Sequence, residues 1–429
     1  MEFNSVCVLG LGYIGLPTAC LFATSGIKVI GVDTNNNVIE SLSHGKTHIF
    51  EPGLQELFEN AVAQEKLLVK GKPQTADAFI ISVPTPFRDG KQADLSYVIS
   101  AAELITPCLK NGNLVILEST SPPRTTIDIV APILEKSGLK AGVDFLLAYS
   151  PERVLPGQIL REMVQNDRVI GGIDKGSSIA GKALYSTFVR GQIATTDATT
   201  AEMVKLMENT YRDINIAAAN EFARLAEVFS IDIWEAIRLA NRHPRVEILN
   251  PGPGVGGHCI SVDPWFLVKA APEISELIHT ARLINDSQPN HVVDLLKKIL
   301  GSLKGRKIAA LGLAYKPDVD DLRESPAVRI VELLIEAGSE VNIFEPYKSN
   351  FVISGANTTN NLSDAVKDAE IILLLVGHTQ FRSISPEHLK SLSQAKYIFD
   401  SVNIWEEKSC ENFGYSYFRL GDGKSLNIV

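Results

Sequence analysis

The most restrictive feature of this 429-residue chain is a pattern of strand, glycine turn, helix and strand that occurs twice. An apolar run over residues 5–9 leads into a loop with three glycines at 10–15, and a second apolar run then ends at Asp33. Residues 306–345 repeat this order, with a longer loop after the first strand. Each copy is typical of the unit from which nucleotide-binding α/β domains are built.

Further short apolar runs predict additional strands, at residues 78–83, 114–118, 145–149, 371–376 and 397–399. Their continuous hydrophobicity is typical of parallel strands covered on both faces. The stretch 199–229 contains no Gly or Pro and predicts one long helix, with Thr199 as its cap and Glu202 in its first turn. We therefore expect an α/β fold with two Rossmann-like, doubly wound domains joined by a long central helix.

The overall charge argues against several classes of partner. There are 41 Lys and Arg against 50 Asp and Glu, giving a net charge of −9, and no basic block occurs. We therefore expect neither nucleic acid nor an anionic membrane as a partner, and any anionic ligand must meet a local basic pocket. The longest apolar run, 371–377, is far below the roughly 20 residues of a membrane span. With no basic leader at the N-terminus, we expect a cytosolic protein without membrane insertion.

Five scattered cysteines without a CxxC pair predict neither a disulfide framework nor a thiolate metal site. Four are most simply small core or surface residues, whereas Cys259 lies in the polar, glycine-rich loop 251–263. Glycine lets another molecule approach the backbone, and a thiol in such a loop is better placed to react than one in a core. The alternative is an ordinary loop thiol.

The first glycine loop fits G-x-G-x-x-G through Gly10, Gly12 and Gly15. Its backbone N–H groups would meet a pyrophosphate, and Asp33 would accept hydrogen bonds from ribose hydroxyls. A carboxylate there would repel a 2′-phosphate, so NAD is favoured over NADP. A tight turn without a ligand is the alternative.

Two sets of polar residues could complete a site. Thr85 and Thr120 follow predicted strands, where a doubly wound sheet places its ligands, although both could simply be loop caps. Lys205, Asn209 and Arg212 share one face of the long helix. Such a stripe is usually solvated, but an anionic or oxygen-rich ligand would explain the amide between two cations.

Five ordered motifs show that the chain resembles the UDP-glucose/GDP-mannose dehydrogenases almost from end to end. The motifs are Gly10-x-Gly12-Tyr13-Ile14-Gly15-Leu-Pro, Ser150-Pro-Glu152-Arg153, Ala201-Glu-Met-Val-Lys205-Leu-Met-Glu-Asn209, Gly254-x-Gly-Gly-x-Cys259 and Gly312-Leu-Ala-Tyr315-Lys316-Pro-x-x-Asp-Asp-Leu-Arg323-Glu-Ser-Pro. The resemblance implies an NAD-binding domain at 1–198, a central helical region for dimerisation and catalysis at 199–300, and a UDP-sugar-binding domain at 301–429. It also implies a homodimer.

The resemblance implies a four-electron oxidation of the sugar's C6 hydroxyl to a carboxylate with two NAD. Cys259 would form a thiohemiacetal and then a thioester, which water hydrolyses. Lys205 would serve as acid/base and electrostatic group, assisted by Asn209 and Asp263, while Glu152 would orient the hydrolytic water and Thr120 would hold a water or the nicotinamide.

The implied binding residues fall into two sets. NAD would be bound by Gly10, Gly12, Tyr13, Ile14, Gly15, Asp33, Thr85 and Thr120. The UDP-sugar would be bound by Arg153, Val154, Lys205, Asn209, Arg212, His243, Arg245, Gly256, Tyr315, Lys316 and Arg323, with Arg245 supplied by a second subunit.

The chain departs from the UDP-glucose enzymes at two motifs. It has Arg153-Val-Leu-Pro156-Gly where they show Phe-Leu-x-Glu-Gly, and Val262 where they have Lys. These departures favour an N-acetylated sugar, and we expect UDP-N-acetyl-D-mannosamine, oxidised for a bacterial surface polysaccharide. The alternatives are UDP-N-acetylglucosamine as substrate, or a catalytically silent nucleotide-sugar sensor.

Overall fold

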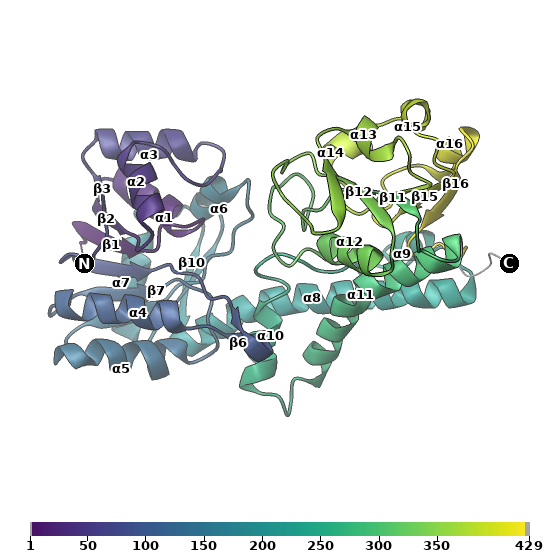
Figure 1. Ribbon diagram of the computed structural model, residues 1–429. Helices are drawn as coiled ribbons and strands as arrows, with labels where there is room; N and C mark the ends of the chain where they lie inside the picture. The colour runs from purple at the N-terminus through teal and green to yellow at the C-terminus, as the bar shows by residue number, and fades with distance from the viewer. Residues whose placement is uncertain (1, 425–429) are drawn as a thin grey trace. The chain divides into compact units, whose positions relative to one another are not determined.

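A computed structural model describes residues 2–424 of the chain. It divides into two compact units, Met1–Glu208 and Asn209–Val429. Each unit contains a twisted sheet flanked by helices (Figure 1).

The N-terminal unit contains an eight-stranded sheet in the order β10-β9-β8-β7-β4-β1-β2-β3. Its strands are β1 (Ser5–Leu9), β2 (Lys28–Val32), β3 (Leu67–Lys70), β4 (Ala78–Ile81), β7 (Leu114–Leu117), β8 (Leu146–Tyr149), β9 (Arg168–Gly172) and β10 (Ile193–Asp197). All neighbouring pairs are parallel except β8 and β9, which are antiparallel. From β3 to β8 the order is that of a Rossmann sheet. A hairpin of β5 (Phe87–Arg88) and β6 (Gln92–Ala93) follows β4.

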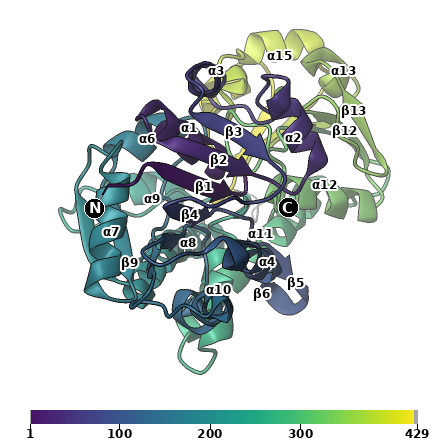
Figure 2. The same ribbon diagram turned by 90° about the vertical axis from the view of Figure 1, so that its left-hand side faces the viewer.

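Helices cover both faces of this sheet. They are α1 (Gly15–Thr24), α2 (Asn36–Ser43), α3 (Leu54–Ala63), α4 (Ser96–Ile105), α5 (Ala131–Leu134), α6 (Ile159–Gln165) and α7 (Lys175–Tyr185), with a π-helical turn at Thr126–Val130 before α5. Alternate residues of β1 serve two cores: Val6 and Val8 pack with α1, α3, α6 and α7, whereas Cys7 and Leu9 pack with α4 and α5. Figure 2 shows β1, β2 and β3 side by side in this unit. The unit is therefore doubly wound.

The long helix α8 extends over Ala198–Phe229, as the absence of Gly and Pro predicts. The expected cap was wrong. The helix begins one residue before Thr199, and Asp197 accepts hydrogen bonds from the backbone N–H and the hydroxyl of Thr200, over 2.9 and 2.6 Å. Glu202 instead turns inward to the backbone N–H groups of Arg124 and Thr126.

The C-terminal unit contains a second, six-stranded sheet in the order β13-β12-β11-β14-β15-β16, parallel throughout. Its strands are β11 (Lys307–Leu311), β12 (Glu340–Phe344), β13 (Ala356–Thr359), β14 (Ile371–Leu374), β15 (Tyr397–Asp400) and β16 (Ser416–Arg419). This is again the Rossmann order, so the predicted fold class is confirmed.

Helices of the C-terminal unit also cover both faces of the sheet. After α8, this unit contains α9 (Ile233–Ala240), α10 (Asp263–Ala270), α11 (Glu276–Leu300), α12 (Pro326–Glu336), α13 (Leu362–Val366), α14 (Thr379–Arg382), α15 (Pro386–Leu392) and α16 (Glu407–Asn412), of which α11 to α16 cover the sheet. Ile308 and Ala310 of β11 face α11 and α12, whereas Ala309 and Leu311 face α13 to α16.

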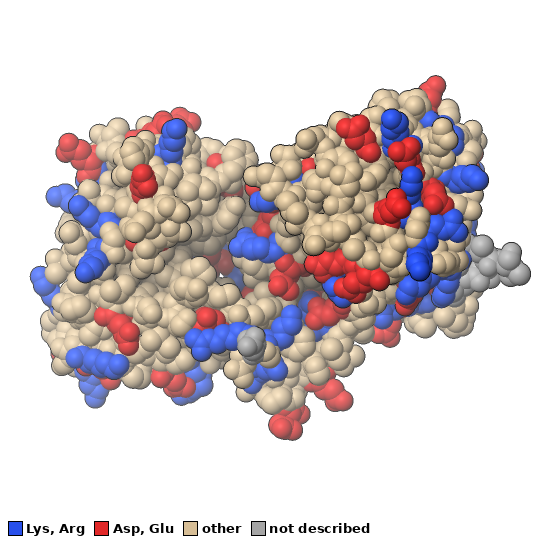
Figure 3. Space-filling view, viewed as in Figure 1, with Lys and Arg blue, Asp and Glu red and all other residues tan. Residues whose placement is uncertain are grey.

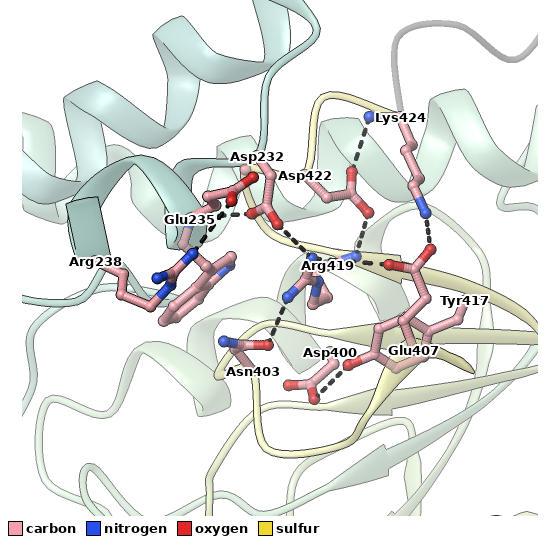
Figure 4. A network of polar contacts seen from close by, with 12 residues as sticks. Asp232, Glu235, Arg238, Asp400, Asn403, Glu407, Tyr417, Arg419, Asp422 and Lys424 are labelled. Atoms are coloured by element: carbon pink, nitrogen blue, oxygen red, sulfur yellow. Dashed lines mark hydrogen bonds and ion pairs between the residues drawn. The ribbon is translucent and has the colours of Figure 1, made fainter. Parts of the chain in front are cut away.

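Arg419 ties the end of the last strand to the start of α9. Its guanidinium donates to Asp232, which caps α9, over 2.8 Å, and to Asn403 over 2.9 Å. Figure 4 shows Arg419 at the centre of this polar network, with Glu407 and Asp422 beside it. The network fixes the turn after β16 against the helical part of the unit.

Candidate active site

The first glycine loop is shaped by two close approaches and one open position. Gly10 has φ +89°, and a Cβ there would lie 2.4 Å from the carbonyl oxygen of Ser82. A Cβ on Gly15 would lie 1.8 Å from the carbonyl oxygen of Gly10. At Gly12, by contrast, a Cβ would meet nothing within 4 Å. The first and third glycines therefore close the turn, and the second leaves its backbone accessible to a ligand.

Asp33 follows β2 and reaches back to this loop. Its carboxylate accepts hydrogen bonds from the backbone N–H groups of Leu11, over 3.0 Å, and Asn35, over 2.8 Å. The side chain is half-buried. Tyr13 and Ile14 pack against the core beneath the loop. The predicted set Gly10 to Gly15 and Asp33 is thus brought together in the geometry of a dinucleotide fingerprint.

In the second copy of the pattern, the acidic residue that follows the second strand is buried inside the protein. Glu345 is buried, and its Oε2 accepts the N–H groups of Leu313 and Ala314 over 2.6 and 3.0 Å and lies 3.2 Å from Nε2 of His378. The other oxygen accepts the N–H of Tyr347 over 2.9 Å. Unlike the half-buried Asp33, this carboxylate is buried and also contacts His378, which favours the N-terminal unit for the dinucleotide.

Thr85 and Thr120 are brought together beside the carboxyl ends of β4 and β7. The hydroxyl of Thr85 donates to the carbonyl oxygen of Thr120 over 2.7 Å. Both side chains are half-buried. They lie where a doubly wound sheet binds its ligand, as the sequence predicts.

Glu152 and Arg153 are held by other side chains of the N-terminal unit. Glu152 accepts from the guanidinium of Arg168, and its other oxygen accepts the N–H of Arg153 over 2.8 Å. Arg153 forms an ion pair with Glu208 over 2.6 Å and donates to the carbonyl oxygen of Asp167. Val154 packs against the core. The carboxylate of Glu152 is therefore fixed at both oxygens.

Sequence reasoning missed a buried group beside Glu152. Glu118 accepts a hydrogen bond from the hydroxyl of Tyr185 over 2.8 Å and lies 3.6 Å from Nη1 of Arg168. Burial raises the pKa of Glu118 to about 7, although the charge of Arg168 opposes that shift. Arg168 and Tyr185 lie outside every recognised motif, so the only available signal was a Glu at the end of an apolar strand.

The cysteine loop is built around two glycines that pack on the segment between β11 and α12. A Cβ on Gly256 would lie 2.9 Å from Cβ of Tyr315, and one on Gly257 would lie 2.8 Å from the tyrosine ring. The N–H of Gly257 donates to the carbonyl oxygen of Arg323 over 3.0 Å. The loop that carries Cys259 is thereby brought together with the predicted substrate residues Tyr315 and Arg323. Glycine is required by this close contact.

Charged side chains accompany this loop. Nζ of Lys316 lies 5.8 Å from the ring centroid of Tyr315. Arg323 is exposed and pairs with Asp321 over 2.6 Å. Partial burial would raise the pKa of Asp321, but the hydrogen bonds from Arg323 outweigh it and hold the pKa below its usual range. Two cations therefore flank the loop in a chain of negative net charge.

Cys259 is half-buried at the turn that leads into α10. Its carbonyl oxygen accepts the N–H groups of Val262 and Asp263 over 3.0 and 2.8 Å. Asp263 is buried and accepts from the side-chain amide of Asn209 on α8 over 2.5 Å. Asn209 of the long helix and the loop residues Cys259 and Asp263, all predicted as catalytic, thus form one connected group.

The start of the same loop is clamped by residues that the sequence did not single out. The N–H of Gly252 donates to Asn220 of α8 over 2.9 Å, and its carbonyl oxygen accepts from Gln288 of α11 over 3.2 Å. Both side chains are fully buried. No motif marks them, because an amide inside a long helix has no local signature.

The remaining predicted residues are placed differently. Lys205 is buried on α8, whereas Arg212, two turns later, is exposed, so only part of the predicted stripe is solvated. His243 and Arg245 lie in the exposed segment after α9, where the N–H of Arg245 donates to Nδ1 of His243 over 3.3 Å. Their positions do not bring them into the group around Cys259.

Charges of both signs are mixed on the surface of the protein. On the face shown in Figure 3, Lys and Arg are interspersed with Asp and Glu. Within residues 2–424, no cluster of three or more His, Cys, Asp or Glu side chains is placed to hold a metal ion. In the same part of the chain, every helix is too short or too polar to cross a bilayer.

Family models cover most of the chain. The UDP-glucose/GDP-mannose dehydrogenase family matches through its NAD binding domain over residues 4–189, its central domain over 199–287 and its UDP binding domain over 309–407. The chain belongs to the UDP-glucose/GDP-mannose dehydrogenase family. The family predicted from the five motifs is thus confirmed. As a member of it, this chain is an NAD-dependent dehydrogenase of UDP-sugars, which also confirms the predicted cofactor.

Relatives within the UDP-glucose/GDP-mannose dehydrogenase family match over almost the whole chain. A UDP-N-acetyl-D-mannosamine dehydrogenase of Methanocaldococcus jannaschii is 48% identical, over 98% of this chain and 97% of the relative. An NDP-N-acetyl-D-galactosaminuronic acid dehydrogenase of Ralstonia nicotianae is 46% identical, over 95% and 98%. The structure of a UDP-D-ManNAc dehydrogenase from Pyrococcus horikoshii aligns with a TM-score of 0.91 at 42% identity, covering 98% and 99% of the two chains.

Proposed function

We propose that this enzyme oxidises UDP-N-acetyl-D-mannosamine at C6 to UDP-N-acetyl-D-mannosaminuronate. The observation that carries the proposal is near full-length similarity, at up to 48% identity, to relatives named for this substrate. The changes at Arg153 to Pro156 and at Val262 support it, because they separate this chain from the UDP-glucose pattern. The product would serve a bacterial surface polysaccharide.

The proposed chemistry is a four-electron oxidation in two stages. NAD, when bound, supplies the hydride acceptor for each stage. The C6 hydroxyl first becomes an aldehyde, and the sulfur of Cys259 adds to its carbonyl carbon to form a thiohemiacetal. Loss of a hydride and a proton leaves a thioester on Cys259. Water then forms a C–O bond as the C–S bond breaks, which yields the carboxylate, the free thiol and a proton.

The catalytic roles proposed for this chain follow the contacts of its side chains. Lys205 takes the proton of the C6 hydroxyl and stabilises the oxyanion, for which its burial is an advantage because charge acts more strongly away from water. Asn209 and Asp263 hold the turn that carries Cys259. Glu152 orients the hydrolytic water, and Thr120 holds a water or the nicotinamide.

The binding roles are also proposals. For NAD they rest on the open backbone at Gly12 and on the half-buried Asp33, together with Gly10, Tyr13, Ile14, Gly15, Thr85 and Thr120. For the UDP-sugar they rest on the cations and aromatic ring around the cysteine loop. That set is Arg153, Val154, Lys205, Asn209, Arg212, His243, Arg245, Gly256, Tyr315, Lys316 and Arg323.

We further propose a homodimer in which α8 forms the interface. In the C-terminal unit this helix exposes Tyr211, Phe222, Leu225 and Phe229, which are 72%, 43%, 44% and 68% exposed. Their spacing places them along one side of the helix, and exposed apolar residues grouped in this way are typical of an association surface. A partner's copy would bring its own Arg245 to the site.

We also propose that residues 1–198 bind NAD, that residues 199–300 serve catalysis and dimerisation, and that residues 301–429 bind the UDP-sugar. We propose a cytosolic location, because both NAD and nucleotide sugars are metabolites of the cytosol.

The substrate is tested by NADH formation with equal concentrations of the manno, gluco and galacto epimers of the UDP-N-acetylhexosamine. We expect the highest kcat/KM for the manno epimer and a uronate as product. The galacto epimer is the second candidate, because a relative named for an N-acetylgalactosaminuronic acid is 46% identical. A clear preference for the gluco or galacto epimer would overturn the proposed substrate and leave the oxidation chemistry intact.

A further inference from the structure

Arg168 directly contacts a residue of the proposed machinery. It begins β9, which runs antiparallel to β8 with Ala148 opposite Gly172 and Tyr149 opposite Gly171. Continuing this register past the end of β8 places Glu152 opposite Arg168. The two side chains meet there, and the guanidinium of Arg168 donates to Oε2 of Glu152.

Arg168 is itself fixed on several sides. Its Nη1 donates to the hydroxyl of Ser150 over 3.1 Å and lies 3.6 Å from Oε1 of Glu118. The guanidinium carbon lies 4.2 Å from the ring centroid of Tyr185, whose hydroxyl donates to Glu118. The side chain of Arg168 is 4% exposed. A planar, buried cation held in this way has one available orientation, and it presents that orientation to Glu152.

We propose that Arg168 is a positioning residue that fixes the carboxylate of Glu152 for hydrolysis of the thioester on Cys259. This inference rests on the proposed function, because it needs the thioester and the role of Glu152 in orienting water. The carboxylate fixed in this way can accept a hydrogen bond from the attacking water. The buried Glu118 and Tyr185 serve as the support on the far side of Arg168.

The step affected is the last one of the cycle. A water held by Glu152 adds to the acyl carbon of the thioester, the C–S bond breaks, and Cys259 recovers its thiol while the uronate leaves. Neither oxidation involves that water. A defect in Arg168 should therefore slow hydrolysis and leave the two oxidations largely unchanged.

The decisive variant is Arg168→Lys, because lysine keeps the positive charge but lacks the fork that reaches Glu152 and Ser150 together. We expect turnover to fall about 10- to 100-fold, as misplacement of a catalytic group by about 1 Å does. KM should fall together with kcat, because the acylated enzyme accumulates while the earlier steps keep their rates. Rapid quenching and peptide mass analysis should show most Cys259 acylated at steady state, after an NADH burst at the wild-type rate. Arg190→Lys, at an exposed position of the same unit, should behave as wild type.

Two further variants separate positioning from a general effect on folding. The double variant Arg168→Lys/Glu152→Gln should hydrolyse the thioester no more than about twofold more slowly than Glu152→Gln alone. The effects should not add, because both substitutions remove the same interaction, the contact between Arg168 and Glu152. Ser150→Ala leaves the contacts of Arg168 with Glu118 and Glu152 in place and removes only its hydrogen bond to the Ser150 hydroxyl. Ser150→Ala should slow hydrolysis by up to about fivefold. If Arg168→Lys does not fold, this variant tests the role of Arg168 in its place.

Failure of the inference and failure of the proposed function give different results. If wild-type Cys259 is acylated but neither Arg168→Lys nor Ser150→Ala increases the acylated fraction, the role of Arg168 is wrong. The same holds if Arg168→Lys slows the NADH burst as much as turnover. If the wild-type enzyme makes uronate without any acylated Cys259, the proposed chemistry is wrong.

Discussion

The side-chain amide of Asn209 donates to the carboxylate of Asp263 over 2.5 Å, although 54 residues separate them in the sequence. The contact joins α8 to the first turn of α10, and the N–H of Asp263 donates in turn to the carbonyl oxygen of Cys259. A polar residue in the middle of a long helix thus supports the turn that presents the thiol.

The contact between Asn209 and Asp263 predicts that two substitutions of Asn209 respond differently to pH. Asn209→Ala removes a hydrogen bond from a buried carboxylate and should lower the free energy of unfolding by about 1–3 kcal/mol, with a loss of kcat. Asn209→Asp places two carboxylates together, so one must be protonated for the contact to reform. Its kcat should therefore recover as the pH falls, whereas that of Asn209→Ala should not. Parallel pH profiles for the two variants would contradict this account.

The glycine loop predicts that cofactor binding and folding can be separated. A Cβ at Gly12 meets nothing within 4 Å, so Gly12→Ala should leave the melting temperature nearly unchanged while weakening NAD binding about tenfold or more, because the methyl group occupies the side on which the pyrophosphate approaches. Gly15→Ala should destabilise the N-terminal unit instead, because its Cβ would lie 1.8 Å from the carbonyl oxygen of Gly10. Calorimetric titration with NAD and thermal melting measure the two effects. Equal effects from both substitutions would show that the loop is not arranged as described.

Glu227 predicts a dependence of stability on pH in the C-terminal unit. It is 2% exposed, and burial together with the nearby Asp422 raises its pKa to about 7. Because the folded pKa is above the unfolded value of 4.5, the folded protein retains the proton more strongly, and this contribution to stability is lost as the pH rises from about 4.5 through 7. Glu227→Gln should be more stable than wild type at pH 8, by up to about 3 kcal/mol, and similar to it near pH 4.5.

Denaturant unfolding at several pH values measures this effect. Glu221→Gln, at an exposed position of the same helix, is the matched control and should leave the profile unchanged. The assignment to Glu227 would be wrong if its variant kept the wild-type slope between pH 5 and 8.

The apolar stripe on α8 predicts the oligomeric state. Leu225→Glu should convert the dimer to a monomer, because a charge on that surface would have to be desolvated on association. Light scattering after size-exclusion chromatography gives the molar mass directly. Leu68→Glu, at a leucine of similar exposure on β3, should remain dimeric. A wild-type monomer, or a dimer that Leu225→Glu leaves intact, would place the interface elsewhere.

Much of the fold could be predicted because its signals are local. Gly10 to Gly15 with Asp33, and the run without Gly or Pro from 199 to 229, each carry a pattern that a single segment determines. The strands β9 and β10, which extend the sheet beyond its six strands in Rossmann order, were not predicted. Their polar and glycine residues interrupt the hydrophobic runs. The cap of α8 was wrong since Asp197 is a stronger cap than Thr199 and takes the position first.

The residues of the site could likewise be predicted only where their signals are local. Cys259 was found because its loop is rich in glycine, and the packing of Gly256 on Tyr315 explains that richness. Arg168, Glu118 and Asn220 were missed since their roles depend on partners far along the chain. A buried ion pair or an amide clamp exists only after the strands and helices have assembled, and single-sequence patterns report neither.

The two-stage oxidation is tested most directly by the amount of NADH formed when the enzyme consumes a limiting quantity of UDP-N-acetyl-D-mannosamine with excess NAD. We expect two NADH for each sugar and a uronate as the only product, with no free aldehyde at any time. One NADH for each sugar, with release of the C6 aldehyde, would contradict the two-stage oxidation.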